Sequence, residues 1–282
     1  MARIASLAIL TGTQGGKDYL AESYGKVIEN VQKNTISAQL KNTDLSGDPT
    51  TGTVEAKRFT NSSSQAYGTA RSGGAGTKVT ANPVTISINV NRELINEVEE
   101  KDTRLYGVEG LVTRKSAMDQ KSMERELERA FFTEAVTAGT AATLTATAIN
   151  KKVEELIQTI ENTQNDYVDG VPRDLISVVL DTATYGDLRD FLDTVQNANV
   201  DTGAGEFGIF HGVKVFPSVY LPANTKMIGM VNGSIAQPVV TSLDEAGKFP
   251  ASDAYHFGMF FYYGTKAVTP DLIQVVTAST GA

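Results

Sequence analysis

The sequence predicts an α+β protein, and three observations support that fold class. Residues 103–138 place apolar side chains three to five positions apart, which is typical of one very long helix. Residues 54–60 and 85–94 have strand patterns and flank a stretch almost without large apolar side chains. Residues 150–231 alternate between helical and strand patterns, so this middle part is compatible with an α+β or an α/β subdomain.

The composition excludes several classes of protein. The 282 residues include no Cys, which excludes a disulfide framework, thiolate metal sites and a cysteine nucleophile. No apolar run approaches the length of a membrane-spanning helix, so we expect no membrane partner. A net charge of −8 argues against a dedicated nucleic-acid binder, and two His residues leave few groups for acid–base chemistry near neutral pH.

The N-terminal part predicts a short amphipathic helix followed by a loop. From Lys17 to Val31 the apolar residues recur at helical spacing. Residues 39–53 show no period and contain Gly, Asp, Pro and Thr, which favours a loop or an extended arm.

The next part predicts a long two-stranded finger. VEAKRFT (54–60) is the outgoing strand, and TISINVNREL (85–94) is the returning one because its apolar and polar residues alternate. Between them, residues 60–77 contain Tyr67 as the single large apolar side chain and Arg71 as the single charge. Such a stretch cannot bury enough surface to offset its ordering entropy, and an isolated hairpin is marginal in water. We therefore expect the finger to lie against another molecule; a disordered surface loop is the alternative.

The long helical pattern of residues 103–138 predicts a structural beam. At ~1.5 Å per residue the segment would span roughly 50 Å, which is several times the mean for globular proteins. The alternative is two helices with a break. Residues 139–149 are small and form a link to the next part.

The middle of the chain alternates helices and strands. The predicted helices cover 150–165 and 182–195, and the predicted strands cover 174–181, 211–216 and 225–231. Asn150 is the expected cap of the first helix, and Thr182 or Thr184 that of the second.

The C-terminal part predicts a closing hairpin of two strands, residues 255–264 and 271–278. The first of these strands carries aromatic side chains on both faces, so we expect it to be buried on two sides.

Four features resemble functional motifs without meeting their requirements. GAGEFG (203–208) has dinucleotide-binding spacing but lacks the preceding strand and following helix, so a mobile loop is expected. GTQGGKD (12–18) fails the spacing of a phosphate-binding loop, and a turn before a helix is expected. His211 and His256 have no partner pattern for catalysis or metal binding. The sequence therefore assembles no active site.

The order of these elements resembles the major capsid proteins of tailed bacteriophages, which have the HK97-like fold. The resemblance extends over nearly the whole chain. Local segments are also similar to those of such shell proteins: FHGVKVFPSVYLP (210–222), KMIGMVNGSI (226–235) and YYGTKAVTPDLIQVV (262–276).

The resemblance implies an HK97-like division of the chain. Residues 1–50 would be an N-terminal arm, and residues 51–92 the extended β-hairpin loop. Residues 93–144 and 236–282 would form a peripheral domain with the long spine helix, and residues 145–235 an axial domain.

The resemblance also implies a structural subunit rather than an enzyme, with no cofactor. Such subunits assemble into pentamers and hexamers of an icosahedral shell that encloses double-stranded DNA without sequence-specific binding. The extended loop would lie across a neighbouring subunit. We therefore expect intersubunit contacts from five loop residues: Lys57, Arg58, Phe59, Tyr67 and Arg71.

The implied partners are other copies of the chain, a scaffolding protein, a portal and decoration proteins. Because Met1 lies close to the predicted arm, a separate scaffold is expected rather than a removed extension. The implied location is the virion capsid, with the host cytoplasm during assembly.

Two alternatives stay open at this point. An encapsulin, a bacterial compartment of similar fold, would enclose a cargo enzyme instead of a genome. A soluble α/β enzyme would use the region of residues 182–216, although no residue set there supports a reaction.

Overall fold

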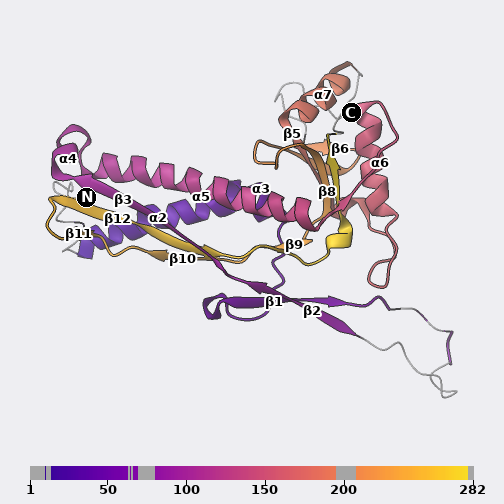
Figure 1. Ribbon diagram of the computed structural model, residues 1–282, viewed down its shortest axis with the longest axis horizontal. Coiled ribbons are helices and arrows are strands. Elements are labelled where there is room, and N and C mark those ends of the chain that lie inside the picture. Colours follow the sequence, from indigo (N-terminus) through magenta and orange to yellow (C-terminus); the bar gives the residue numbers. More distant parts are fainter. Residues whose placement is uncertain are drawn as a thin grey trace.

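The computed structural model describes residues 10, 14–62, 64, 66–68, 80–194 and 208–278. Figure 1 shows an elongated molecule in which one long helix, α5 (Val108–Ala138), connects two layered regions. A four-stranded sheet lies along the first part of this helix, and a six-stranded sheet lies at its C-terminal end. A two-stranded hairpin projects from the body, so the mixed α+β class is confirmed.

The N-terminal part forms helix α2 (Gln14–Asn34) and the short helix α3 (Ile36–Leu40). The predicted helix from Lys17 to Val31 is confirmed and is longer at both ends. Gln14 to Lys17 are already helical, so the turn expected there is wrong for these residues. Between Leu40 and the hairpin the chain is largely irregular, as expected for a loop or arm, with one 3₁₀ turn, η1 (Pro49–Thr51).

The predicted finger is a hairpin of β1 (Thr53–Phe59) and β2 (Ala81–Ser87). The two strands are antiparallel and paired along their whole length, from Thr53 opposite Ser87 to Phe59 opposite Ala81. The single returning strand over residues 85–94 is wrong. The alternating pattern runs through two strands, because β3 (Val90–Glu99) leaves β1 and pairs with a different sheet.

The long helical pattern contains the break that we gave as an alternative. The short helix α4 (Glu100–Tyr106) ends at Gly107, and α5 begins at Val108. Gly107 has a φ of +70°, a conformation that glycine adopts without the penalty of a side chain. Helix α5 continues for 31 residues, or about 46 Å at ~1.5 Å per residue.

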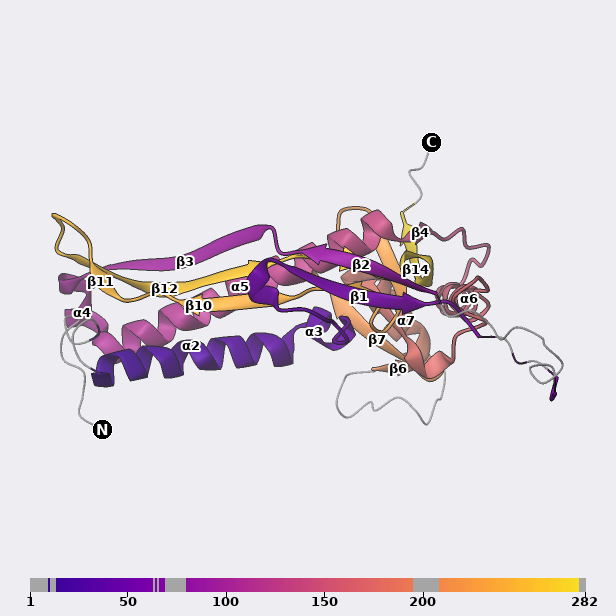
Figure 2. The same ribbon diagram turned by 90° about the horizontal axis from the view of Figure 1, so that it is seen from below.

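The four-stranded sheet is built around β12 (Ala254–Tyr263). This strand pairs with β3 along all ten residues, and its other edge pairs with β10 (Val239–Leu243) and β11 (Gly247–Lys248). Helices α2 and α5 run beside the sheet in both views (Figures 1 and 2). The core between them includes Tyr24, Val112, Leu127, Phe257 and Met259.

The prediction that the aromatic strand is buried on two sides is wrong. Phe257, Phe261 and Tyr263 are buried, whereas Phe260 and Tyr262 between them are only half-buried. Alternate residues of a strand point to opposite faces. Phe257, Phe261 and Tyr263 therefore share one face, which packs in the core with α2 and α5.

The six-stranded sheet has a core on each face. Val178 on β5 packs among residues of α6 (Ile149–Glu161) and α7 (Thr182–Thr194), and Val179 packs on the other face with Phe131 and Phe132 of α5. The strands in spatial order are β4 (Thr140–Ala141), β14 (Ile273–Thr277), β8 (Thr225–Val231), β5 (Ile176–Asp181), β7 (Val213–Ser218) and β6 (Ile209–Phe210). The strands and helices expected in the middle of the chain are therefore confirmed.

The expected helix caps are wrong. Helix α6 starts at Ile149, so Asn150 lies inside it and Ala148 occupies the cap position. At α7 the side chain of Asp181 accepts a hydrogen bond from the backbone N–H of Thr184, at 2.9 Å. The last residue of β5 thus supplies the cap, and Thr182 is already helical.

The predicted closing hairpin is also wrong. Strand β12 belongs to the four-stranded sheet, whereas β14 pairs antiparallel with β8 in the six-stranded sheet. Between them the chain pairs β13 (Lys266–Ala267) with β9 (Ile235–Ala236). Because β12 pairs with β3 and β14 pairs with β8, the connection between β12 and β14 crosses from one sheet to the other. It does not turn back to form a hairpin.

Candidate functional site

The two faces of the hairpin have different surroundings. Val54 and Ala56 on β1 are buried, whereas Glu55, Lys57 and Phe59 are exposed. This alternation follows from the strand geometry, which sends successive side chains to opposite faces. The inner face packs against the body of the same chain in a small apolar cluster of Val54, Ala56, Ile86, Ala236 and Val268.

The outer face carries an apolar and cationic patch. Phe59 leaves 55% of its surface exposed, and Lys57 is exposed on the same face two residues earlier. Their cross-strand partners, Ala81 and Pro83, are exposed as well. We call these four residues the outer patch. The outer patch exposes an aromatic ring to water beside a proline and an ammonium group. Such a surface is suited to contact with another protein.

The inner face ends in a polar contact that we call the latch: Arg58, Asn82, Asn165, Tyr167 and Asp271. Arg58 donates from Nη2 to Oδ2 of Asp271 at 2.6 Å, and its guanidinium lies 4.0 Å from the centre of the Tyr167 ring. Asn165 donates to the same Asp271 oxygen at 2.5 Å, and Asn82 donates to the Tyr167 hydroxyl. The latch thus joins both hairpin strands to the loop after α6 and to the 3₁₀ turn η3 (Pro270–Leu272).

Arg58 and Asn165 favour the ionised form of Asp271. Burial raises the pKa of this carboxyl, but the hydrogen bonds from Arg58 and Asn165, together with the charge of Arg58, hold it below its ordinary value of 3.8. Asp271 therefore stays ionised at neutral pH, which keeps the ion pair intact.

This lowered pKa predicts a pH-dependent contribution to stability. A carboxyl whose pKa is lowered in the folded state stabilises the fold at pH values above its ordinary pKa of 3.8. This stabilisation is lost as the pH falls through the pKa of the folded state. Asp271→Asn should therefore cost about 1–2 kcal/mol at neutral pH. Urea unfolding of both proteins across acidic pH checks this. If the difference between their free energies of unfolding stays constant as the pH falls below 3.8, the pKa of Asp271 is not lowered in the folded state.

The structure separates the five loop residues predicted as contacts. Lys57 and Phe59 lie on the exposed face, and Tyr67, in a turn, leaves 92% of its surface exposed. Arg58 points the other way and bonds its own chain. Arg71 lies outside the described residues. The intersubunit role of these residues stays a prediction. Sequence analysis missed Asp271, because 213 positions separate it from Arg58.

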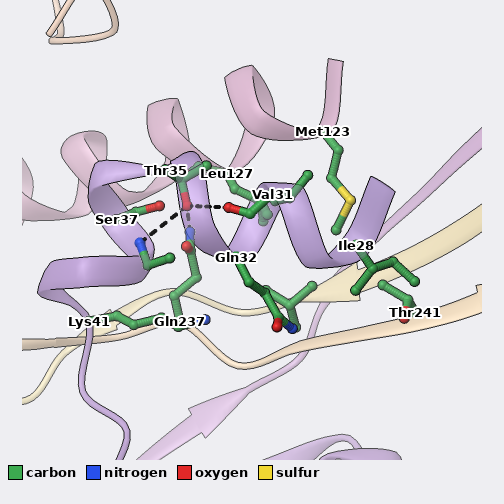
Figure 3. A pocket seen from close by; sticks show the side chains of 12 residues that line it. Ile28, Val31, Gln32, Thr35, Ser37, Lys41, Met123, Leu127, Gln237 and Thr241 are labelled. Carbon is green, nitrogen blue, oxygen red and sulfur yellow. Dashed lines mark hydrogen bonds between the residues drawn. The ribbon is translucent and has the colours of Figure 1, made fainter. Parts of the chain in front are cut away.

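A cavity lies where α2 and α3 meet α5 (Figure 3). It measures about 70 Å³, which is far below the several hundred cubic ångströms of a typical ligand site. Two of its polar side chains are already bonded: the Thr35 hydroxyl donates to the Val31 carbonyl at 2.8 Å, and Gln237 donates to the Leu127 carbonyl at 3.0 Å. Burial lowers the pKa of Lys41, which lines the same space. We call the contact of α2 and α3 with α5 the clamp, and the cavity is part of it.

Two buried carboxyl groups of α5 complete this clamp. Asp119 accepts from the Tyr24 hydroxyl at 2.9 Å, and Glu128 accepts from the backbone N–H of Ser37 at 2.9 Å. Burial raises the pKa of both carboxyls. Through these bonds Asp119 holds α2 and Glu128 holds α3, which is a structural role.

The two histidines lie in ion-pair positions. His256 on β12 is 2.7 Å from Asp244, and His211 in the turn between β6 and β7 is 2.9 Å from Glu154. Glu154 also bonds Arg173 at 2.7 Å. Among the described residues, no group of three or more acidic or histidine side chains is placed to hold a metal ion.

Residues 203–207 of the glycine-rich GAGEFG segment lie outside the described residues, so the loop expected there stays a prediction. Within the described ranges, no helix combines the length and apolar character needed to cross a bilayer.

No protein-family model matches this sequence, and no curated protein matches it. Solved structures do match. A chain from Mycobacterium phage Che8 has a TM-score of 0.62 at 16% identity, over 99% of this chain and 92% of that one. The capsid structure of the cyanophage P-SCSP1u has a TM-score of 0.64 at 10% identity, over 88% and 89%. A virus-like particle from Pyrococcus furiosus has a TM-score of 0.58 at 12% identity, over 92% and 99%.

At identities this low the TM-scores show the fold alone, and the coverage shows that the fold extends over nearly the whole chain. The hairpin and the long helix follow one another in the order that the sequence resemblance implied. The chain therefore has the HK97-like fold that these bacteriophage capsid structures share.

Proposed function

We propose that this chain is the structural subunit of an icosahedral bacteriophage capsid, assembling into pentamers and hexamers that enclose double-stranded DNA. Its role is architectural rather than enzymatic. The observation that carries the proposal is the hairpin: its inner face is bound to its own chain, and its outer face presents Lys57 and Phe59 to solvent. The likeness to phage capsid structures supports the same conclusion.

The division into four parts belongs to this proposal. Residues 1–50 are the arm, residues 51–92 the extended loop, residues 93–144 and 236–282 the peripheral domain, and residues 145–235 the axial domain. We adjust the division at one point. Because β14 pairs with β8, we assign Ile273–Thr277 to the axial sheet.

The proposed partners follow from the same role. Other copies of the chain would meet the outer patch and Tyr67, and Arg71 would extend the same contact. A separate scaffolding protein, a portal and decoration proteins would complete the particle. The chain would act in the virion capsid after assembly in the host cytoplasm, and its net charge of −8 suits DNA that is enclosed without tight binding.

A protein compartment of the encapsulin type is the second candidate, and one observation favours it. The match to the virus-like particle from Pyrococcus furiosus covers 99% of that chain and 92% of this one. A particle of that kind can therefore be built from a chain of about this length. Such a compartment would hold a cargo enzyme in place of DNA.

The deciding experiment measures the mass, shape and contents of the purified protein. Light scattering and negative-stain imaging should show closed shells, or rings of five or six subunits. Nuclease-protected DNA inside supports the capsid, and a copurified enzyme supports the compartment. A homogeneous monomer of 30.1 kDa, unchanged by crowding agents, would contradict both.

The outer patch gives a residue-level prediction. Phe59→Ser combined with Lys57→Gln should leave the stability of the unassembled subunit within ~0.5 kcal/mol, since both side chains are exposed. Shell yield measured by sedimentation should fall sharply. Leu243→Ser, at an exposed apolar position on β10, is the matched control. If the double variant forms shells in normal yield, the outer patch does not contribute to the contact between subunits.

A further inference from the structure

We propose that Arg58 is a positioning residue, which fixes the direction in which the hairpin leaves the subunit, and does not itself contact the neighbouring subunit. The inference rests on the proposed function only for its consequence in assembly. Its structural part concerns the single chain.

The hairpin has two separate attachments to the body. The first is the apolar cluster around Val54, Ala56 and Ile86. The second is the latch at Arg58, which lies four residues further out than Val54, or about 13 Å along the strand. One attachment near the base allows the hairpin to pivot. A second attachment on the same face defines its direction.

The latch contacts both strands of the hairpin. Arg58 on β1 faces Asn82 on β2 across the ladder, and each has a partner in the body. Just beyond the strand end, the backbone N–H of Asn61 donates to the Asp166 carbonyl at 2.8 Å. Bending away from the body would break all of these contacts together.

The body side of the latch is itself held in place. The side chain of Asn165 accepts from the backbone N–H groups of Tyr167 at 2.9 Å and Val168 at 3.0 Å, which closes the loop that carries the Tyr167 ring. Asp271 lies in η3 beside the buried Leu272. The hairpin is therefore docked on fixed groups.

The chemistry of arginine suits this position. A guanidinium can donate to a carboxylate and stack on an aromatic ring at the same time, whereas an ammonium is a compact point charge. The side chain of Arg58 is only 15% exposed, which leaves little of it to meet another subunit. Lys57, its neighbour in sequence, lies on the opposite face and is exposed.

A hairpin held in one direction has less freedom to lose when it meets a neighbour. Binding costs fall when a segment is already in its bound arrangement. The latch would therefore lower the free-energy cost of assembly without adding to the contact itself, which separates the role of Arg58 from that of the outer patch.

Distance measurement between two spin labels tests the inference. The chain has no Cys, so Ala81→Cys on the hairpin and Lys151→Cys on α6 give one labelled pair. The unassembled subunit should show one narrow distance distribution. Arg58→Gln and Arg58→Lys should each at least double its width, and Tyr167→Leu should broaden it as well. Lys57→Gln is the matched control and should leave it unchanged.

Assembly of the same variants, without labels, gives the second readout. Arg58→Gln should slow shell formation about tenfold while the completed shells keep normal contacts. Thermal unfolding shows whether each variant is folded, and Tyr167→Leu tests the latch without touching the ion pair. An unchanged distance distribution in folded Arg58→Gln and Tyr167→Leu overturns the positioning role. Failure of the unsubstituted chain to form any shell counts against the proposed function and leaves the distance result to decide the latch.

Discussion

Replacing Gly258 with alanine is expected to destabilise the protein by ~3 kcal/mol or more. Gly258 lies in the middle of β12, opposite Ile95 of β3. A Cβ atom at this position would lie 2.0 Å from the backbone oxygen of Leu94. That oxygen belongs to a strand held along ten paired residues, so the clash can be relieved only by separating the two strands.

Chemical denaturation of Gly258→Ala measures this effect, and the chain provides its own control. Gly25 lies within α2 and has no atom within 4 Å of the position that its Cβ would occupy. Gly25→Ala should therefore stabilise the protein by about 0.5–1 kcal/mol, as alanine is the better helix former. If the two variants unfold at the same denaturant concentration, the close approach of β3 and β12 is incorrect.

The second large effect is expected at Phe131. Its ring is fully buried between the end of α5 and the six-stranded sheet, and it meets Phe132 edge to face with ring centres 5.6 Å apart. Phe131→Ala removes this ring and leaves a cavity, which typically costs about 3–5 kcal/mol. The loss should appear as a lower midpoint in urea unfolding.

Met118 on the same helix is the matched control for Phe131. Its side chain is 61% exposed, so Met118→Ala should change the stability by no more than ~0.5 kcal/mol. Similar losses from both substitutions would mean that α5 does not insert its C-terminal part beneath the sheet.

The sequence predicted most elements because their patterns are local. Helical spacing located α2, α5 and α6, and β5 was recognisable as a continuous apolar run. Strand pairing is a different matter, since it depends on contacts between distant segments. Nothing in residues 255–278 indicates that β12 pairs with β3 and β14 with β8, so two neighbouring strands were wrongly joined in a hairpin.

The candidate site shows the same limit. The alternation along β1 was sufficient to place Arg58 on the face of Val54 and Ala56, away from Lys57 and Phe59, and sequence analysis did not use it. The partners of Arg58 could not be found in this way. Asp271 and Tyr167 are distant from the hairpin in sequence and are its neighbours only in the folded chain.

Helix α5 takes part in two hydrophobic cores, with Val112 and Leu127 in one and Phe131 and Phe132 in the other. A rigid helix that joins two cores in this way transmits a rotation at one end as a displacement at the other. Over a length of about 46 Å, a tilt of ~5° at one end displaces the other end by roughly 4 Å. A small change in packing beside the four-stranded sheet is thus amplified at the six-stranded sheet. Force applied to one region is therefore passed to the other along α5, beside the strand connection between β12 and β14.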